Sequence, residues 1–244
     1  MTNKAFMNSV KESLYKTIFP ALVYCLSILF ISSFAHALLY DFEDEAQEKD
    51  WNITDGEGGI RDGVFELQGG AEGQAIVGDA NWTDYTITCK VKFFPECAGD
   101  TDAGIMYRVK DALTHYIYDF NLQQGFIWAA RINGDYIQLG AGMTAPMALE
   151  SDKWYELKVE VKGDDTIAYV DGEEKLAFSH KQLQADAKLD KGAVGIRIWN
   201  SHAMFDDFDV NGPGIQSSPV LPAGKLAITW GCLRYNSIGA WQEE

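Results

Sequence analysis

Apolar and polar residues alternate with a period of two along much of the chain from residue 85 onward. In 85–93, Tyr, Ile, Cys, Val and Phe occupy the odd positions, and Thr and Lys occupy the even ones. The segment 155–162 alternates in the same way, with Glu and Lys between its apolar residues. Successive side chains of a strand point to opposite faces of a sheet, so both segments are predicted to be half-buried β-strands.

Short apolar runs separated by turn sequences continue this pattern. Gly163-Asp164-Asp165 and Asp171-Gly172 are turn signals that flank predicted strands at 166–170 and 173–178. Six more strands are predicted at 104–109, 116–122, 126–132, 136–141, 194–199 and 203–210. Only 181–190 has the composition for a helical turn or two. Many short strands without intervening helices predict an all-β sandwich or barrel.

The first 37 residues have the composition of a leader. Lys4, Lys11 and Lys16 form a basic start, the segment 18–34 is almost purely apolar, and Ala35-His36-Ala37 fits the small-x-small rule for signal peptidase. The apolar run is slightly short for a bilayer span of ~20 residues, so an uncleaved membrane anchor is the weaker alternative. We expect a signal peptide over 1–37 and a mature chain that is secreted, periplasmic or on the cell surface, without an integral membrane span.

The predicted mature chain consists of one sandwich and a short tail. The sandwich is predicted over 38–212, and the Pro-, Gly- and Ser-containing sequence after it indicates a linker and tail over 213–244. The tail is too short to fold alone. It could dock on its own domain, bind a partner or stay loose.

Charge and cysteine content narrow the partners. The formal net charge of the whole chain is −16, which disfavours nucleic acid and anionic membranes as partners. Beyond the leader the cysteines are Cys89, Cys97 and Cys232, an odd number for an exported protein. Cys89 lies on the apolar side of its strand and is predicted to be a small buried hydrophobic residue. No disulfide pairing is predicted.

Several segments resemble concanavalin-like and laminin-G-like jelly-roll domains. The segment 154–161 followed by 167–172 looks like the central hairpin of those domains. Further matching segments, in the same order as in that family, are Tyr40-Asp41-Phe42-Glu43-Asp44 with Trp51, 103–108 before 116–118, and 195–197 before 205–210. The resemblance covers 38–210 and implies an antiparallel two-sheet jelly-roll sandwich.

The resemblance also implies a set of functions. The group includes carbohydrate-binding modules, accessory domains of glycosidases, and exported domains associated with cleavage of 3-keto-glycosides. Those last domains usually carry Asn-Ser-Gly-Ile where this chain has Asp102-Ala103-Gly104-Ile105. The Glu-x-Asp-x-x-Glu signature of glucanases, the Gly-x-Ser-x-Gly elbow and the His-Glu-x-x-His motif do not occur in the sequence.

Strand alternation predicts one polar face with the chemistry of sugar recognition. If the apolar residues of each strand point to the core, polar and aromatic residues between them share the opposite face. Aromatic rings stack on sugar rings, while Arg donors and carboxylate acceptors bind hydroxyl groups. An ordinary solvated sheet face is the alternative. The predicted ligand-binding residues are Arg108, His115, Asp119, Arg131, Tyr136, Gln138, Arg197 and Trp199.

Carboxylates also gather near the two ends of the predicted sandwich. Asp41 and Glu43 lie at the first strand, and Asp206 lies in the last strand on a face shared with Phe208 and Val210. In relatives of this kind those strands are neighbours, and many carry a structural calcium ion nearby. Hard oxygen ligands suit calcium, so Asp41, Glu43 and Asp206 are predicted to hold a structural calcium ion. Two separate solvated acidic strands, or an Arg or backbone N–H partner for the inward carboxylate, are the alternatives.

The leading hypothesis is an exported carbohydrate-binding or cell-surface recognition module that uses the concave sheet face. One alternative is a hydrolase or lyase that acts on a 3-keto-disaccharide, with Asp119, His115 or a neighbouring carboxylate as acid or base. The other is a structural or adhesive domain. Two carboxylates and an Arg converging in a closed pocket would favour the enzyme.

Overall fold

The longest strand, β14 (Ala193–Asn211), runs through both layers of the structure. The computed structural model describes residues 38–138 and 144–216. The first half of β14 pairs with β6 (Asp102–Asp111), and its second half pairs with β5 (Tyr85–Phe93). The strand changes layers at an irregularity between Trp199 and Ser201, where Asn200 has a φ of 47°. β4 (Val64–Val77) follows β14 through the same bend.

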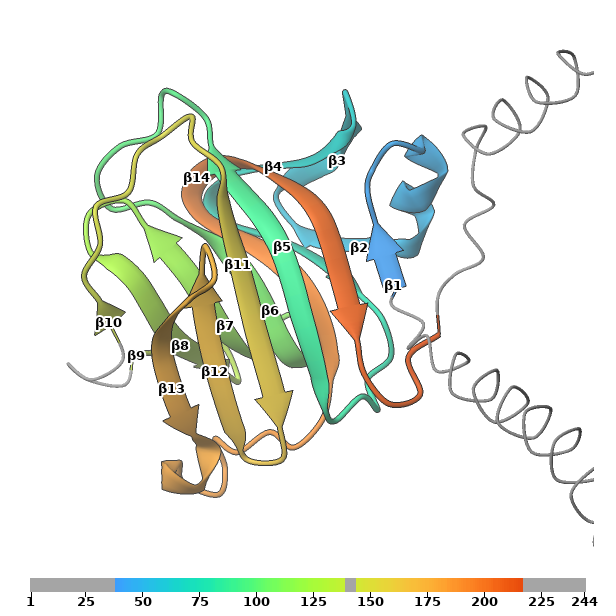
Figure 1. The fold of residues 1–244 in the computed structure, drawn as a ribbon, viewed down its shortest axis with the longest axis vertical. Coiled ribbons are helices and arrows are strands. Elements are labelled where there is room, and N and C mark those ends of the chain that lie inside the picture. Colours follow the sequence, from blue (N-terminus) through green and yellow to red (C-terminus); the bar gives the residue numbers. More distant parts are fainter. Residues whose placement is uncertain (1–37, 139–143, 217–244) are drawn as a thin grey trace, which may run out of the picture. The chain divides into compact units, whose positions relative to one another are not determined.

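The strands form an antiparallel sandwich whose two layers share β14 and β4 (Figure 1). One layer contains β10 (Thr144–Ala145), β9 (Asp135–Gln138), β8 (Gly125–Ile132), β7 (Thr114–Asn121), β6, β14, β4 and β2 (Asn52–Asp55). The other contains β13 (Glu173–Ser179), β12 (Asp165–Val170), β11 (Tyr155–Lys162), β5, β14, β1 (Leu38–Tyr40), β4 and β3 (Glu57–Arg61). The chain thus has the predicted all-β, concanavalin-like jelly-roll fold.

The core lies between the layers and is built by the alternation seen in the sequence. Every odd residue of β5 is buried and every even residue is partly exposed. Cys89 is fully buried in this core as a free thiol, which confirms its prediction, and Cys97 is also free. The β12–β13 turn has positive φ at both Asp171 and Gly172, as the two-residue hairpin signal predicts.

The structure differs from the sequence prediction in two respects. β2, β3 and β4 are not predicted, because glycines and acidic residues in 55–59 and 69–73 interrupt the alternation. The predicted strands 194–199 and 203–210 are one strand, since β14 bends but stays hydrogen-bonded. At the start of the segment 181–190, which is expected to be helical, the structure contains a three-residue 3-10 helix, His180–Gln182. A six-residue 3-10 helix spans Glu45–Asp50.

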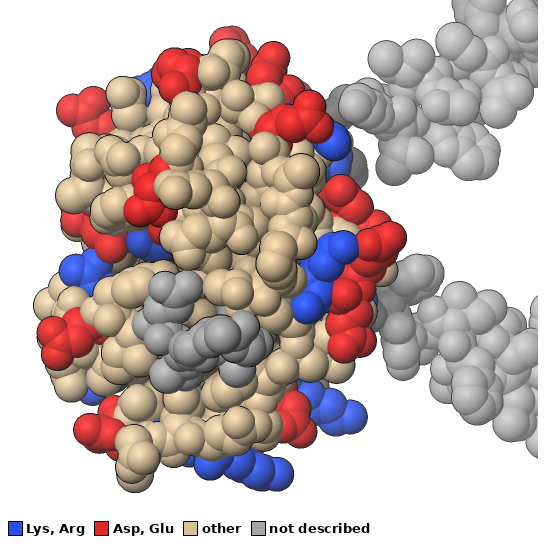
Figure 2. All heavy atoms as spheres, turned by 90° about the vertical axis from the view of Figure 1, so that its left-hand side faces the viewer, with Lys and Arg blue, Asp and Glu red and all other residues tan. Residues whose placement is uncertain are grey.

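Other predictions concern the ends and the surface of the chain. The predicted signal peptide, most of the predicted tail and Cys232 lie outside the described residues and stay predictions. Within 38–138 and 144–216, no helix is both long and apolar enough to cross a bilayer. On the face drawn in Figure 2, Lys and Arg occur in small separate groups and acidic side chains surround a largely uncharged centre.

Candidate functional site

Arg197 on β14 is the centre of a buried charged cluster on the concave sheet face. Its guanidinium contacts the carboxylate of Asp119 on β7, and lies 3.1 Å from Glu72 Oε2 on β4 and 4.0 Å from Asp102 Oδ2 on β6. The strand register aligns Arg197 with Gly104 and Gly104 with Asp119. A Cβ at Gly104 would come within 2.6 Å of Asp119 Oδ1, so the glycine makes room for the ion pair.

Burial and charge oppose each other in this cluster. Burial raises the pKa of Asp119 and of Asp102, although Arg197 favours their ionised forms. Burial alone would lower the pKa of Arg197, but Asp119 and Glu72 outweigh it and raise that pKa. Arg131 Nη1 lies 2.9 Å from Glu72 Oε1, so two arginines hold this glutamate. The charged side chains of the cluster are therefore held in place by their contacts with one another.

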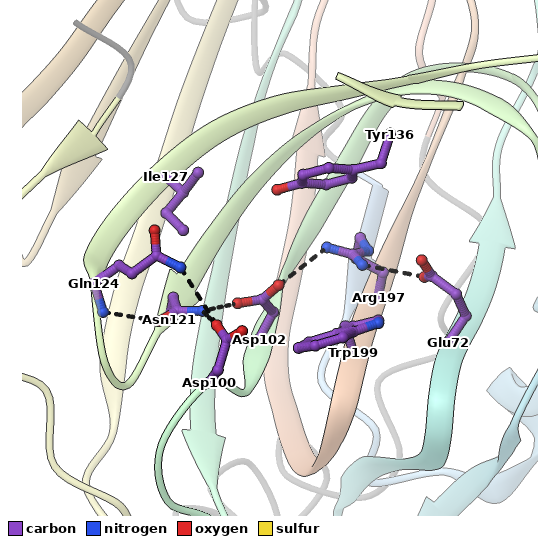
Figure 3. A pocket seen from close by; sticks show the side chains of 9 residues that line it. All are labelled: Glu72, Asp100, Asp102, Asn121, Gln124, Ile127, Tyr136, Arg197 and Trp199. Atoms are coloured by element: carbon purple, nitrogen blue, oxygen red, sulfur yellow. Dashed lines mark hydrogen bonds and ion pairs between the residues drawn. The ribbon is translucent and has the colours of Figure 1, made fainter. Parts of the chain in front are cut away.

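A cavity of about 350 Å³ opens above this cluster. The rings of Tyr136 and Trp199 lie on opposite sides of the Arg197 guanidinium (Figure 3). Tyr136 is 47% exposed, which leaves much of its side chain accessible to a ligand. The residues that line the cavity are Glu72, Asp100, Asp102, Asn121, Gln124, Ile127, Tyr136, Arg197 and Trp199.

Hydrogen bonds fix the polar end of the cavity. Asn121 Nδ2 donates to Asp100 Oδ1 at 2.8 Å and to Asp102 Oδ1 at 2.5 Å. Asn121 Oδ1 accepts the backbone N–H groups of Gln123 and Gln124, which determines the orientation of the amide. The two aspartates are thereby held side by side on the cavity wall (Figure 3).

The structure brings most of the predicted ligand residues to one face. Asp119, Tyr136, Arg197 and Trp199 belong to the cluster or its cavity, and Arg131 reaches the cluster through Glu72. None of the predicted binding roles is tested by these positions alone.

Two further residues predicted on this face, His115 and Gln138, lie on β7 and β9. His115 is opposite Arg131 in the strand register and is completely buried, with Nδ1 3.3 Å from the Asp111 carbonyl oxygen. Burial lowers the His115 pKa to about 4, so the imidazole is neutral near pH 7. Gln138 is opposite Ala129 in the register.

Arg108 is placed elsewhere, and its predicted position on this face is wrong. It has a φ of 50° at an irregularity between β6 and its neighbours, where the alternation of faces is interrupted. Its side chain is buried, with Nη1 3.1 Å from His180 Nδ1 and 2.7 Å from the Leu189 carbonyl oxygen, and Nη2 contacts the Gly163 carbonyl oxygen. Arg108 is therefore a structural residue of the interior.

The sequence prediction did not include Glu72, Asp102 and Asn121. Glu72 lies in β4, which the interrupted alternation does not reveal. Asp102 and Gly104 are two positions apart on β6 and share a face, so strict alternation extended by one step would have included Asp102. Asn121 and Asp119 are likewise two positions apart on β7, so the same alternation would have placed Asn121 on this face.

The residues predicted to hold calcium do not form a cluster. β1 does pair with β14, but a bulge between Asp206 and Asp209 breaks the alternation, so Phe208 is buried while Asp206 is partly exposed. Asp41 accepts the side-chain amide of Gln47 at 2.9 Å. Within the described part of the chain, no three His, Cys, Asp or Glu side chains are arranged to hold a metal ion. The calcium site at Asp41, Glu43 and Asp206 therefore stays an untested prediction.

The fold and the face define a concanavalin-like jelly-roll domain with a polar cavity on its concave sheet. More specifically, the chain belongs to the 3-keto-alpha-glucoside-1,2-lyase-like domain family, whose model matches residues 40–211. A search of curated protein sequences returned no match.

Solved structures share the fold at low sequence identity. The carbohydrate-binding module CBM66 from Bacillus subtilis is 17% identical with a TM-score of 0.59, over 67% of this chain and 96% of that one. A Bacillus subtilis protein of unknown function with a galectin-like fold is 14% identical with a TM-score of 0.57, over 72% and 96%. The GH43 protein BlXynB from Bacillus licheniformis is 18% identical with a TM-score of 0.55, over 71% of this chain and 39% of that chain. These likenesses establish the fold.

Proposed function

We propose that the cavity on the concave face binds one sugar ring of a glycoside. The observation that carries this proposal is the combination of Tyr136 and Trp199 with a polar wall whose groups are held in place by hydrogen bonds. Sugars present apolar C–H faces to aromatic rings and hydroxyl groups to carboxylates and amides. A volume of about 350 Å³ is in the lower range of small-molecule sites, as expected for one ring.

The ligand is a neutral α-glucoside. Arg197, the cation that lines the cavity, is already paired with Asp119 and Glu72, so it is not free to bind a ligand carboxylate. Asp100 and Asp102 add negative charge to the wall and disfavour uronic or sulfated sugars. The family to which residues 40–211 belong supports the choice of an α-glucoside. A secreted or cell-surface location, expected from residues 1–37, suits such a ligand.

Binding is tested by calorimetric titration of methyl α-glucoside into wild type and Trp199→Ala. The loss of one stacking surface should weaken affinity about tenfold. Trp154 is the matched control, since it is 36% exposed and lies outside the cavity, where Lys92 Nζ is 5.2 Å from its ring centre. Trp154→Ala should bind as the wild type does. Equal affinity of wild type and Trp199→Ala would refute the proposed binding mode.

Cleavage of a 3-keto-α-glucoside is the second candidate function, and Asp102 favours it. In a 1,2-elimination, the C2 proton leaves to a base, its electron pair forms the C1–C2 double bond, and the glycosidic oxygen departs from C1 and takes up a proton. The 3-keto group acidifies C2–H. Asp102 lines the cavity with a raised pKa, which suits a group that accepts or delivers a proton. Asp119 and His115, also considered for this role, are almost fully buried and do not line the cavity.

The test of this cleavage is to incubate 3-keto-maltose with the protein and follow the C1–C2 double bond by NMR. Asp102→Asn keeps the shape of the side chain and removes its acid–base function, so it should abolish the product while methyl α-glucoside still binds. Product formation at the wild-type rate by Asp102→Asn would exclude Asp102 as the acid or base.

A further inference from the structure

The sequence Asn-x-Thr occurs twice in the chain, outside the residues that line the cavity of the concave face. Asn52-Ile53-Thr54 lies in β2, and Asn81-Trp82-Thr83 lies in the loop between β4 and β5. Asn followed two positions later by Ser or Thr is the acceptor motif of N-linked glycosylation. Asp50 and Asp79 stand two positions before the asparagines, where bacterial oligosaccharyltransferases require an acidic residue. Both segments therefore have the full acceptor sequence, and the structure decides which of them is accessible.

The loop between β4 and β5 presents its motif to solvent. Asn81 and Thr83, the two residues that the motif requires, are exposed, and so is Asp79. Trp82 between them is partly buried, and its ring packs against the Tyr85 ring at a centroid distance of 6.4 Å. Trp82 thus holds the loop on the sandwich, while the side chains on either side of it stay accessible.

Exposed side chains hold the Asn81 amide. Asn81 Nδ2 donates to Asp79 Oδ1 at 2.9 Å, and Asn81 Oδ1 accepts from Lys191 Nζ at 2.9 Å. Asp79 Oδ1 also accepts the backbone N–H of Asn81 at 2.8 Å, which closes an Asx turn. Asp79 and Lys191 are both exposed, and solvent replaces contacts of such groups at little cost. Nδ2 can therefore be released to an enzyme without disturbing the sandwich.

The other motif is part of a sheet. The Asn52 side chain is exposed, but its backbone is paired with Ile76 of β4. The hydroxyl of this motif, Thr54 Oγ1, donates to Oε1 of the buried Gln74 at 3.3 Å. A transferase binds its acceptor as a segment free of other backbone pairing, so modification of Asn52 would require β2 to leave β4 and lose its backbone hydrogen bonds. The fold therefore leaves Asn81 accessible and withholds Asn52.

Asn81 and the cavity of the concave face belong to opposite ends of the β6–β14 pair. The backbone N–H of Gly192, the residue before β14, donates to the Trp82 carbonyl oxygen at 2.9 Å, which places the loop beside the start of that strand. Trp199 lines the cavity from farther along β14, opposite Asp102, the first residue of β6. The accessible asparagine is therefore separate from the proposed binding site.

We propose that Asn81, and not Asn52, is the acceptor of an N-linked oligosaccharide. The donor is an oligosaccharide carried on a polyprenyl pyrophosphate. Asn81 Nδ2 forms a bond to the anomeric carbon C1, and the bond between C1 and the pyrophosphate oxygen breaks. The electron pair of that bond remains on the pyrophosphate, and Nδ2 loses one proton to solvent. The transfer takes place outside the cytoplasm, where the mature chain is expected from residues 1–37.

The first test incubates the purified, folded chain with a bacterial oligosaccharyltransferase and a lipid-linked oligosaccharide. Peptides spanning 48–57 and 77–86 are treated in parallel, because they present the two motifs without the fold. Mass spectrometry should find the glycan on both peptides. In the folded chain, the occupancy of Asn81 should be at least tenfold higher than that of Asn52. An unmodified peptide 77–86, an unmodified Asn81 in the folded chain, or equal occupancy of the two asparagines would each overturn the proposal.

Variants of the two motifs identify the residue that carries the glycan. Asn81→Gln and Thr83→Ala each remove the motif at an exposed position, so both should lose the glycan and keep the wild-type unfolding temperature. Asn52→Gln is the matched control, because it makes the same change in the other motif, and it should be modified as the wild type is. A folded Asn81→Gln variant that still gains the wild-type glycan mass would contradict the assignment.

The protein isolated from its own source provides the second measurement. Trypsin cleaves after Lys and Arg, so it separates the two motifs into the peptides 50–61 and 62–90. The peptide 62–90 should carry the mass of an oligosaccharide on Asn81, and the peptide 50–61 should have its unmodified mass. Recovery of the peptide 62–90 in its unmodified form alone would overturn the proposal.

Discussion

Two buried arginines, one beside the cavity and one in the interior of the sandwich, have different surroundings. Arg197 and Arg108 are each 1% exposed, and both were predicted on the same face. Arg197 is surrounded by carboxylates and lines a cavity. Arg108 is bound by two carbonyl oxygens and His180, and among the described residues no carboxylate lies within ion-pair distance of it.

The difference shows what each environment can do. Charged partners fix the Arg197 guanidinium beside open space, where a ligand can meet the surrounding groups. Neutral partners enclose Arg108, and its Nη1 links His180, whose Nε2 lies 3.2 Å from the Tyr107 hydroxyl, to the loop carbonyl of Leu189. Trp128 Nε1 also donates to that hydroxyl at 2.5 Å. The first arginine organises a charged cluster beside a cavity, whereas the second ties the sheet to the segments that cover its end.

Arg108→Ala should have the largest effect of the variants that separate the two arginines. It removes the donors of two carbonyl oxygens and leaves a cavity in the interior, so we expect a loss of about 3–5 kcal/mol in the free energy of unfolding. Chemical denaturation measures this loss. Arg61→Ala is the control, because the Arg61 side chain is 60% exposed and its ion pair with Glu66 should contribute less than about 0.5 kcal/mol. A loss below about 1 kcal/mol for Arg108→Ala would contradict its structural role.

Acid should destabilise the Arg108 region through His180. Burial, and then Arg108, lower the His180 pKa from 6.5 to about 3, so the unfolded chain binds a proton at a higher pH than the folded one. The contribution of His180 is therefore complete above pH 6.5 and falls as the pH decreases toward 3. The loss amounts to about 1.4 kcal/mol per pH unit, or roughly 2 kcal/mol at pH 5.

Denaturation of His180→Gln at pH 7 and pH 5 checks this prediction. The variant has no imidazole to titrate at this position, so its stability should fall less than that of the wild type over this interval. His115, with a pKa lowered to about 4 by burial, should account for part of the fall that remains. An identical pH dependence in wild type and His180→Gln would show that His180 is not the group responsible.

The Arg197 region should tolerate changes at its wall better than changes in the core. Tyr136 is 47% exposed, so Tyr136→Ala should alter the free energy of unfolding by less than about 1 kcal/mol. The loss of its ring should weaken methyl α-glucoside binding about tenfold, close to 1.4 kcal/mol. Thermal unfolding and titration of the same preparation measure the two effects. A large loss of stability with unchanged affinity would place Tyr136 in the structural group with Arg108.

The smallest expected effect concerns the pair Arg131–Glu72 at the edge of the cluster. Their side chains are 20% and 17% exposed, so solvent screens the interaction in part. A double-mutant cycle with Arg131→Ala and Glu72→Ala should give a coupling energy of about 0.5–1 kcal/mol. A coupling energy near zero would show that Arg197 alone holds Glu72 in place.

The amino-acid sequence by itself determined the fold class and most of the residues on the polar face of the sheet. Strict alternation in 85–93 and 155–162 reflects the geometry of a strand, in which every second side chain enters the core. The same rule correctly aligned Asp119 with Arg197, because β6, β7 and this half of β14 are regular there. Local periodicity is sufficient wherever the backbone stays regular.

Tertiary structure decided the features that depend on irregular backbone and on distant chain segments. A single residue of positive φ turned Arg108 into the core, and a bulge with positive φ at Asp207 turned Asp206 out of it. One added residue in a strand moves the side chains of all following residues to the opposite face of the sheet. The alternation in the sequence does not mark where such a residue occurs. Glu72 joined Arg197 only because β4 pairs with β14, although 125 positions separate them in the chain. Long-range pairing of this kind is a property of the folded chain and leaves no local pattern in the sequence.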